Sequence, residues 1–351
     1  MECVPALFRR GVPSYEDVRR RVLKVFVEPV VVPRGVRRYG RERVKVFRYV
    51  VKCERVYQVV AESLSRVSTL PKLGDLPPFY AELIDIASDG AWDQIVDRAR
   101  KGVKIVSRLW KEYRSKILSC YSGAEAKKLA REFVGRVLSV VRRSLKNFDK
   151  IENVVKIMRI TPCIDTEAPT IIVAGMPQVG KSTLVSTLSS AKPEIAPYPF
   201  TTKNVILGHM DLGPIKLQII DTPGILDRPV EEMNPIERRA VAALKHLKAV
   251  VLFLMDPSKD SYYGFDEQVA TLRNVLQICG RDRTLVVFNK VDKVDRSRLE
   301  ECRKIVEGMG MSVDAEISAL YGIGIDNMLR KVAEKLRELY GIDIERLLRS
   351  T

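Results

Sequence analysis

Two kinds of hydrophobic pattern divide this chain. Through the first half, apolar residues recur three and four positions apart, which predicts helices over 44–67, 79–87, 92–121 and 124–158. Residues 25–32 are predicted to be extended instead. Breakers at Pro71, Pro77 and Gly123 separate these segments into antiparallel neighbours, so a helical bundle is expected. The last helix carries one stripe: Leu129, Phe133, Val137, Val141, Leu145, Phe148, Ile151, Val155 and Met158.

From residue 170 onward, short apolar runs alternate with helical patterns. This alternation predicts a doubly wound α/β domain. The connection over 211–214 is too short for a crossover helix, so the strands on either side of it should pair antiparallel inside an otherwise parallel sheet, as in Ras-like domains. A linker between prolines, 161–169, then separates a helical-bundle domain (1–165) from a Ras-like domain (166–345). The expected strands are 170–174, 205–207, 215–220, 283–288 and 313–317, and the expected helices lie near 181–190, 234–246, 264–279, 296–309 and 325–340.

A glycine-rich loop joins the first of these strands to the helix after it. It reads Gly175-Met-Pro-Gln-Val-Gly-Lys-Ser182, a G-x-x-x-x-G-K-S pattern whose backbone N–H groups can wrap a phosphate chain. Lys181 is expected to reach the β- and γ-phosphates, and the Ser182 hydroxyl to bind Mg²⁺. The residues predicted to bind nucleotide here are Gly175, Pro177, Gln178, Val179, Gly180, Lys181, Ser182 and Thr183.

Three more motifs follow at strand ends, where open α/β sheets bind their ligands. In Asp221-Thr-Pro-Gly224, the carboxylate can hold Mg²⁺ through a water and the Gly224 N–H can bond the terminal phosphate. In Asn289-Lys-Val-Asp292, the Asp292 carboxylate can accept hydrogen bonds from the N1–H and the exocyclic amine of guanine, whereas adenine would leave it unpaired. Taken singly, such turns are usually structural, but their order predicts a site for GTP or GDP. Its remaining members are Asn289, Lys290, Ser318, Ala319 and Leu320, the last three contacting the base carbonyl.

With these segments in place, the chain resembles the translation-factor-related GTPases. Pro197-Tyr-Pro-Phe-Thr-Thr202 is typical of their Obg-like branch. The closer resemblance is to the Nog family of nucleolar GTP-binding proteins and their archaeal relatives, through Gly208–Asp211, Asp221–Asp227, Asn234–Arg238, Ala242–Leu247 and Leu76–Leu83. The resemblance implies a role in assembling the large ribosomal subunit, with its precursor and rRNA as partners. It also implies that Thr202 closes on Mg²⁺ and the γ-phosphate, giving a catalytic set of Lys181, Thr202 and Gly224 and a metal set of Ser182, Thr202 and Asp221.

Two residues depart from related GTPases. Ile225 stands where Ras-like proteins place a glutamine that orients water, so intrinsic hydrolysis should be slow and assisted by a partner or a cation. Gln178 stands where some relatives use an asparagine to bind potassium, and its longer side chain argues against potassium activation. Arg228, Arg238 and Arg239 could supply charge in cis or form a solvated face. Because Ile225 cannot position a water, an RNA-binding scaffold stabilised by nucleotide, with incidental turnover, stays the alternative function.

The net positive charge of the chain is confined to its first half. The 351 residues carry 60 Lys and Arg against 44 Asp and Glu, a net charge of +16. Up to residue 165 there are 35 basic and 19 acidic residues, and after it 25 of each. This excess predicts contact with a polyanion, for which we favour RNA over a merely solvated surface. The candidates are Arg34, Arg37, Arg38, Arg41, Arg43 and Lys45, followed by Lys127, Lys128, Arg131, Arg142 and Arg143.

Other classes of protein fit less well. Six cysteines without a C-x-x-C pair and two histidines argue against a metal cluster or a disulfide scaffold. No apolar run approaches the roughly 18 residues that span a bilayer, and the N-terminus lacks a signal-peptide pattern, so a soluble intracellular protein is expected. We expect no DNA or membrane partner and favour a monomer. The C-terminus is short beside that of eukaryotic family members, which favours a cytoplasmic over a nucleolar location.

Overall fold

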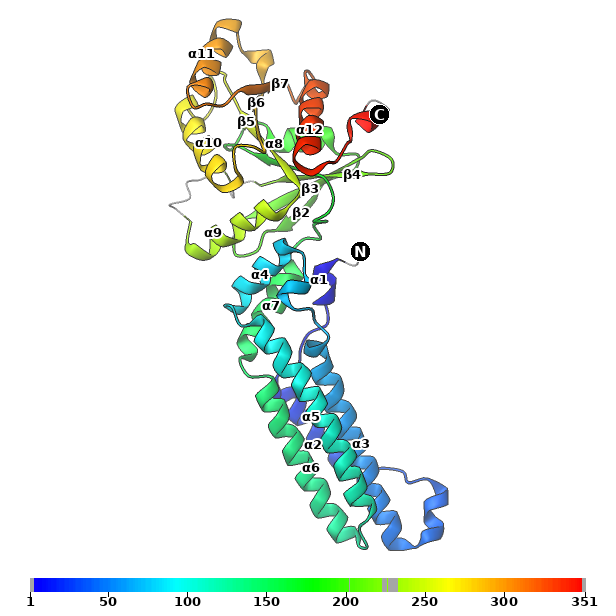
Figure 1. Cartoon of the computed structure of the whole chain (residues 1–351). Coiled ribbons are helices and arrows are strands. Elements are labelled where there is room, and N and C mark those ends of the chain that lie inside the picture. The colour runs from blue at the N-terminus through cyan, green and yellow to red at the C-terminus, as the bar shows by residue number, and fades with distance from the viewer. Residues whose placement is uncertain (1–2, 202, 223–225, 227–232, 349–351) are drawn as a thin grey trace. The chain divides into compact units, whose positions relative to one another are not determined.

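The computed structural model describes residues 3–201, 203–222, 226 and 233–348, with the side chains of 34, 36 and 37 left out (Figure 1). The chain folds into two compact units. One, the helical unit, comprises Ala6–Leu76 and Ala87–Arg159. The other, the sheet unit, comprises Met1–Pro5, Pro77–Ile86 and Ile160–Thr351. Two segments from the N-terminal half thus cluster with the sheet unit, and the domain boundary at residue 165 stays a prediction.

The helical unit is built on α3 (Arg41–Ser68), α5 (Trp92–Leu118) and α6 (Gly123–Ser144), which lie along one another in Figure 1, with α2 (Tyr15–Val27) against α3. Their buried faces form one core rich in valine, which confirms the predicted bundle. Among the described residues, no helix has the length and apolar content to cross a bilayer. The shorter elements of this half are α1 (Val4–Leu7), η1 (Arg34–Tyr39), η2 (Leu73–Asp75), α4 (Pro78–Ser88) and α7 (Phe148–Ile160).

Two sequence-based expectations for this half are wrong. Residues 25–27 end α2 and are not extended: Ser14 and Asp17 cap this helix reciprocally, and Val18 and Val22 are buried, so tertiary packing overrides the extended preference of the valines. The apolar stripe expected over 124–158 belongs to two helices. Asn147, with φ of 62°, adopts the left-handed conformation that ends a helix, and α7 begins at Phe148.

The sheet unit contains seven strands in the order β2-β3-β4-β1-β5-β6-β7. β3 runs antiparallel to both of its neighbours and the remaining pairs are parallel, which confirms the predicted mostly parallel sheet with one antiparallel strand. Two strands, β2 and the fully buried β5, had not been expected. The strands are β1 (Thr170–Ala174), β2 (Glu194–Pro197), β3 (Asn204–Asp211), β4 (Lys216–Asp221), β5 (Ala249–Met255), β6 (Thr284–Phe288) and β7 (Val313–Glu316).

Helices cover this sheet as in a doubly wound fold. Leucines and valines of α8 and α12 share one buried cluster with β1, β4 and β5, so these two helices lie on the same face. Because β1, β5, β6 and β7 are parallel, the loops that follow them emerge at one edge of the sheet. The helices are α8 (Lys181–Leu188), α9 (Pro235–Ala242), α10 (Phe265–Cys279), α11 (Arg296–Glu307), α12 (Ile325–Tyr340) and α13 (Glu345–Leu348), with η4 (Ala243–His246) and η5 (Val291–Lys293).

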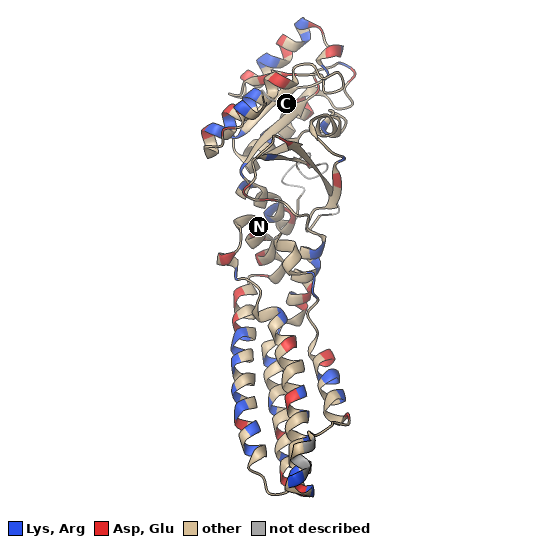
Figure 2. Cartoon of the chain, turned by 90° about the vertical axis from the view of Figure 1, so that its right-hand side faces the viewer, with Lys and Arg blue, Asp and Glu red and all other residues tan. Residues whose placement is uncertain are grey.

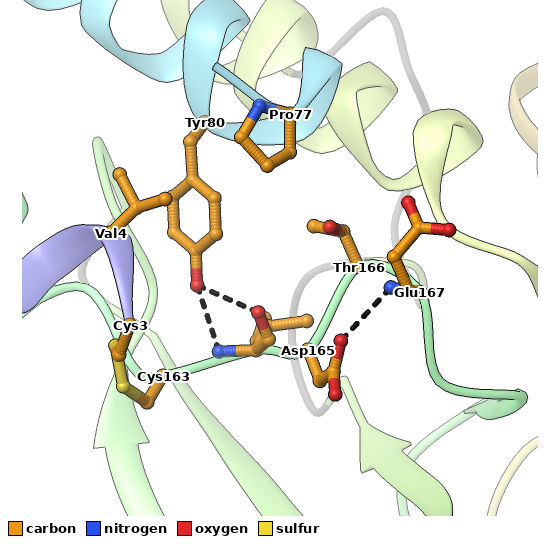
Figure 3. A pocket seen from close by; sticks show the side chains of 9 residues that line it. Cys3, Val4, Pro77, Tyr80, Cys163, Asp165, Thr166 and Glu167 are labelled. Carbon is orange, nitrogen blue, oxygen red and sulfur yellow. Dashed lines mark hydrogen bonds between the residues drawn. A yellow bond between two sulfur atoms is a disulfide. The ribbon is translucent and has the colours of Figure 1, made fainter. Parts of the chain in front are cut away.

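The N-terminal segments of the sheet unit are held by specific contacts (Figure 3). The buried Tyr80 hydroxyl of α4 donates to the Ile164 carbonyl at 2.9 Å and accepts from the Ile164 N–H at 2.8 Å. A disulfide joins Cys3 to Cys163 beside a cavity of about 150 Å³, whereas the sequence had led us to expect no disulfide scaffold. A single bridge is compatible with a fold that also has a large apolar core, and the other four cysteines are free and buried.

Candidate nucleotide-binding site

The loop between β1 and α8 has the backbone of a phosphate cradle. Gly175 and Gly180 have φ of 137° and 102°, which L side chains rarely adopt. A Cβ at Gly175 would lie 2.4 Å from the Leu254 carbonyl oxygen, and one at Gly180 would lie 2.3 Å from Asn289 Nδ2. Both positions therefore require glycine. The loop can close around a small anion only because these two residues let it pass so near β5 and β6.

The charged and hydroxyl groups of this loop lie where phosphate and Mg²⁺ chemistry needs them. Lys181 is almost fully buried, and its Nζ donates to the carbonyl oxygens of Gly175 and Met176 at 2.7 and 2.9 Å, inside the curve of the loop. The Ser182 hydroxyl donates to Asp221 Oδ2 at 2.9 Å. A hydroxyl and a carboxylate are the hard oxygen ligands that Mg²⁺ prefers, so this pair fits the ion. Thr202, Gly224 and Ile225 lie outside the described residues.

Asn289, at the end of β6, connects two of the predicted loops. Its side chain is buried; Nδ2 donates to the Val179 carbonyl at 2.8 Å, and Oδ1 accepts from the Ala319 N–H at 2.9 Å. Thr187 of α8 adds a hydrogen bond to the Ala319 carbonyl at 3.1 Å. One amide therefore holds the phosphate loop against the loop predicted to contact the base. Ser318 is buried at the start of that second loop, and Leu320 is exposed.

Lys290 also contacts the phosphate loop, and it pairs with Asp256, a residue that the sequence did not point to. Its Nζ donates to the Gln178 carbonyl at 2.8 Å and to Asp256 Oδ2 at 2.7 Å. The Asp256 side chain is 1% exposed, and its Oδ1 accepts from the Ser258 hydroxyl at 2.6 Å. Asp256 directly follows the apolar run of β5, as Asp221 follows the apolar residues of β4. The strand-end rule used for the other motifs would have found it.

The structure brings most of the predicted nucleotide-binding residues to one edge of the sheet. Gly175, Asn289 and Ser318 follow β1, β6 and β7, and Asp221 ends β4, which is parallel to β1. Pro177, Gln178 and Thr183 are exposed, and Val179 is buried. Asp292 lies in η5 with its carboxylate exposed, at a position open to a ligand. The groups at this edge suit a nucleoside phosphate, and the Asn289 amide and the Asp292 carboxylate stay the residues predicted to contact the base.

Family models match both halves of the chain. The model of the NOG1 N-terminal helical domain matches residues 33–165, and that of the 50S ribosome-binding GTPase matches residues 170–290. An uncharacterized protein of Methanocaldococcus jannaschii is 33% identical over 251 residues, which are 71% of this chain and 70% of that protein. The chain belongs to the Nog family of GTP-binding proteins. It is therefore a GTP-binding protein with the domain of a GTP-hydrolysing enzyme.

Eukaryotic members of the Nog family are longer. Nucleolar GTP-binding protein 1 of Drosophila melanogaster is 33% identical over 280 residues, 79% of this chain and 42% of the relative. That of Encephalitozoon cuniculi is 34% identical over 310 residues, 85% of this chain and 58% of the relative. The chain thus spans about half the length of these relatives. Their names are nucleolar, which is contrary to the judgement that this chain is not nucleolar; the cytoplasmic location stays a prediction.

The Nog-type helical unit gathers part of the predicted RNA-binding set at one end of the bundle. Glu42 Oε2 accepts from the Gly123 N–H at 2.8 Å, so the first turns of α3 and α6 are adjacent. Figure 2 shows Lys and Arg along these helices. Arg142 and Arg143 end α6, about 24 Å from its first turn at 1.5 Å per residue, and so lie apart from the rest. The exposed residues near the shared end are Arg38, Arg41, Lys45, Lys127, Lys128 and Arg131.

A cleft of about 540 Å³ opens at this end of the bundle. Its lining includes Arg38, Tyr39, Arg43 and Phe47. Tyr39 is 77% exposed, whereas Arg43 is half-buried and donates from Nη1 to the Leu118 carbonyl at 2.7 Å. Arg34 and Arg37 lie in η1, and their side chains are outside the described set. The cleft therefore combines an exposed aromatic ring with the positive charge of Arg38 and Arg43.

Proposed function

We propose that this Nog-family protein is a GTP-hydrolysing molecular switch in the assembly of the large ribosomal subunit, and that its basic helical half contacts rRNA. The observation that carries the nucleotide part is the Asn289 amide, which holds the phosphate loop and the Ser318–Leu320 loop together at the edge of the sheet where Asp221 ends β4. The names of its relatives and of the matching GTPase model support the ribosomal part.

The site residues have separate tasks in this proposal. Lys181 gives up its two loop carbonyls for the β- and γ-phosphates, because an ionic contact is stronger than a contact to a neutral carbonyl. Ser182 and Asp221 hold Mg²⁺, which when bound supplies charge to offset that of the phosphates. Asp292 accepts the N1–H and amino group of guanine. Thr202 and Gly224 sense the third phosphate, and hydrolysis is slow because Ile225 cannot position a water.

The basic end of the bundle is the proposed rRNA contact. Arg38, Arg41 and Lys45 carry positive charge on a surface whose unit holds the whole charge excess of the chain. Such side chains bind phosphates without reading sequence, whereas the exposed Tyr39 ring offers a face on which an unpaired base can stack. This arrangement favours an RNA with unpaired bases over a regular duplex.

A direct test measures RNA crosslinking and affinity with the protein loaded with a nonhydrolysable GTP analogue or with GDP. We expect large-subunit rRNA to be the main crosslinked species, with an affinity that falls steeply with salt and differs between the nucleotides. Equal association in both states would instead support the RNA-binding scaffold with incidental turnover. An RNA affinity that does not depend on salt concentration would contradict the proposed contact between the basic helical half and rRNA.

A substitution at Thr202 separates the two functions further. Thr202→Ala should bind GTP but remain on ribosomal precursors, because the protein would no longer sense the loss of the third phosphate. Release of this variant at the wild-type rate would contradict the switch. Comparing hydrolysis in sodium and potassium buffers tests the expectation from Gln178 that potassium does not activate.

A further inference from the structure

Helix α4 of the N-terminal half is bound to α9 of the sheet unit by one arginine. Arg239 Nε donates to Glu82 Oε1 at 3.0 Å, and its Nη2 donates to Asp85 Oδ2 at 3.0 Å. Glu82 and Asp85 are three residues apart, so both face the same side of α4. The two carboxylates raise the pKa of Arg239. Arg239 had been a candidate for activating hydrolysis in cis, and its guanidinium is instead engaged with α4.

Ala240, the next residue of α9, is bound by a residue that follows β2. The Tyr198 hydroxyl donates to the Ala240 carbonyl at 2.7 Å, and both residues are fully buried. Burial raises the pKa of Tyr198, so this hydroxyl stays protonated and donates. Tyr198 begins the segment that leads to Thr202, which we propose to sense the third phosphate. One rigid turn of α9 therefore contacts that segment with one residue and α4 with another.

The segment that leads to Thr202 is held in a strained turn. Phe200 has φ of 61°, a conformation that costs a bulky side chain energy. The Tyr198 N–H donates to the Lys203 carbonyl at 3.0 Å, and the Thr201 hydroxyl donates to the Tyr198 carbonyl at 3.1 Å. These bonds tie Thr201 and Lys203, the two chain neighbours of Thr202, to Tyr198. Strain of this kind is typical of segments with two alternative conformations.

We propose that α4 receives the nucleotide state through Tyr198, α9 and Arg239. This inference rests on the proposed function only in taking Thr202 and Gly224 as phosphate sensors. Asn234 caps α9 and is paired reciprocally with Glu237, so the helix starts firmly ten residues after Gly224. The neighbours of Thr202 thus connect to α9 through Tyr198, and Gly224 precedes α9 in the sequence. Because Arg239 forks between two carboxylates, it resists rotation better than a single ion pair would.

The chain carries this response into the helical half. Residues Pro77–Ile86 belong to the sheet unit, and helix α4 continues beyond them into Ala87 and Ser88 of the helical unit. There the Ala87 carbonyl accepts from Asn153 at 2.7 Å, and Asp89 pairs with Lys150 at 2.9 Å. The last turn of α4 is therefore fixed to α7. Helix α4 thus begins among residues of the sheet unit and ends among residues of the helical unit, which is the route we propose for the response.

Hydrogen exchange of the full-length protein tests this inference. Amide exchange over 78–86 is compared with the GTP analogue and with GDP bound, in the wild type and in Arg239→Gln. We expect the exchange rates of the wild type to differ several-fold between nucleotides and those of Arg239→Gln to be equal. The matched control is Arg273→Gln, because Arg273 is exposed on α10 and has no polar contact within the described part of the chain. Glu82→Gln combined with Asp85→Asn breaks the same contact from α4.

The outcomes separate this inference from the proposed function. GDP affinity within twofold of the wild type shows that a variant is folded; should Arg239→Gln fail this criterion, the double variant on α4 gives the answer. Identical exchange rates of α4 in the two nucleotide states of the wild type overturn the inference. A difference in exchange between the nucleotide states that persists in Arg239→Gln and in the double variant on α4 overturns it too. If α4 responds while RNA affinity does not depend on nucleotide, the inference stands and the proposed switch fails.

Discussion

Replacing Asp256 by asparagine should weaken both GDP and GTP binding about tenfold. The carboxylate is 1% exposed and binds Lys290 Nζ at 2.7 Å. A hydrogen bond to a charged group contributes about 1.5–3 kcal/mol. Lys290 keeps its bond to Gln178 and is 30% exposed, so water replaces part of the loss. The lower end of the range is therefore appropriate, and about 1.4 kcal/mol corresponds to a factor of ten in affinity.

The reason for an effect on affinity is preorganisation. Lys290 ties the end of β6 to the phosphate loop through the Gln178 carbonyl, and Asp256 fixes Lys290 in that position. Without the carboxylate, a smaller fraction of the molecules has the two loops in the arrangement that binds nucleotide. The apparent affinity falls in proportion to that fraction. GDP and GTP should weaken equally, because Asp256 pairs with Lys290 of the motif predicted to read the base and not with the residues proposed to sense the third phosphate.

Fluorescent GDP and GTP analogues give the two dissociation constants, and urea unfolding gives the stability of the same variant. Ser258→Ala is the matched control, since it removes the hydroxyl on Asp256 Oδ1 and leaves the Lys290 pair intact. We expect its nucleotide affinity to remain within twofold of the wild type. If Asp256→Asn loses stability but keeps wild-type affinity for both nucleotides, Asp256 only supports the fold and the reasoning is refuted.

Three further predictions concern the nucleotide site and the RNA surface. Gly180→Ala should abolish nucleotide binding without unfolding the protein, because the new Cβ would lie 2.3 Å from Asn289 Nδ2; measurable GDP binding in a calorimetric titration would contradict this. Ser182→Ala should weaken GTP binding in Mg²⁺ and make it insensitive to EDTA, since the hydroxyl beside Asp221 is a proposed ligand; an unchanged EDTA response would argue against that pair. Tyr39→Ala should weaken binding of single-stranded RNA by about 1–3 kcal/mol, whereas Tyr39→Phe, which retains the ring, should bind with the wild-type affinity. Equal losses of affinity in the two variants, measured by filter binding, would exclude stacking.

The sequence predicted β1, β4 and β6 well because each is a mostly buried apolar run with a polar motif at its end. Gly175, Asn289 and Ser318 could be placed at one edge of the sheet from the sequence alone, since parallel strands force their carboxyl ends together. Asp256 was missed although it obeys the same rule, because no motif of several residues surrounds it. Its role depends on Lys290, which follows a different strand, and such a pairing needs the three-dimensional structure.

The helical half was predicted less well, for physical reasons that differ by segment. Valines at 25 and 27 favour extended structure locally, but they complete a helix whose Val18 and Val22 are buried against the core. The break at Asn147 leaves the apolar period almost intact, because a single left-handed residue redirects the chain without removing an apolar position. Hydrophobic periodicity therefore gave the helices but not the bend between α6 and α7.

The most consequential difference between sequence and structure is the assignment of α4. A boundary at residue 165 places this helix with the bundle, yet Tyr80 is bonded to the backbone of Ile164, and Glu82 and Asp85 to Arg239. These three polar side chains fix α4 within the sheet unit. The same helix ends among residues of the helical unit, so the chain passes from one unit to the other along α4. In the proposed switch the nucleotide state acts on α4 through Arg239, so substituting Arg239 should remove the response without touching either proposed binding site.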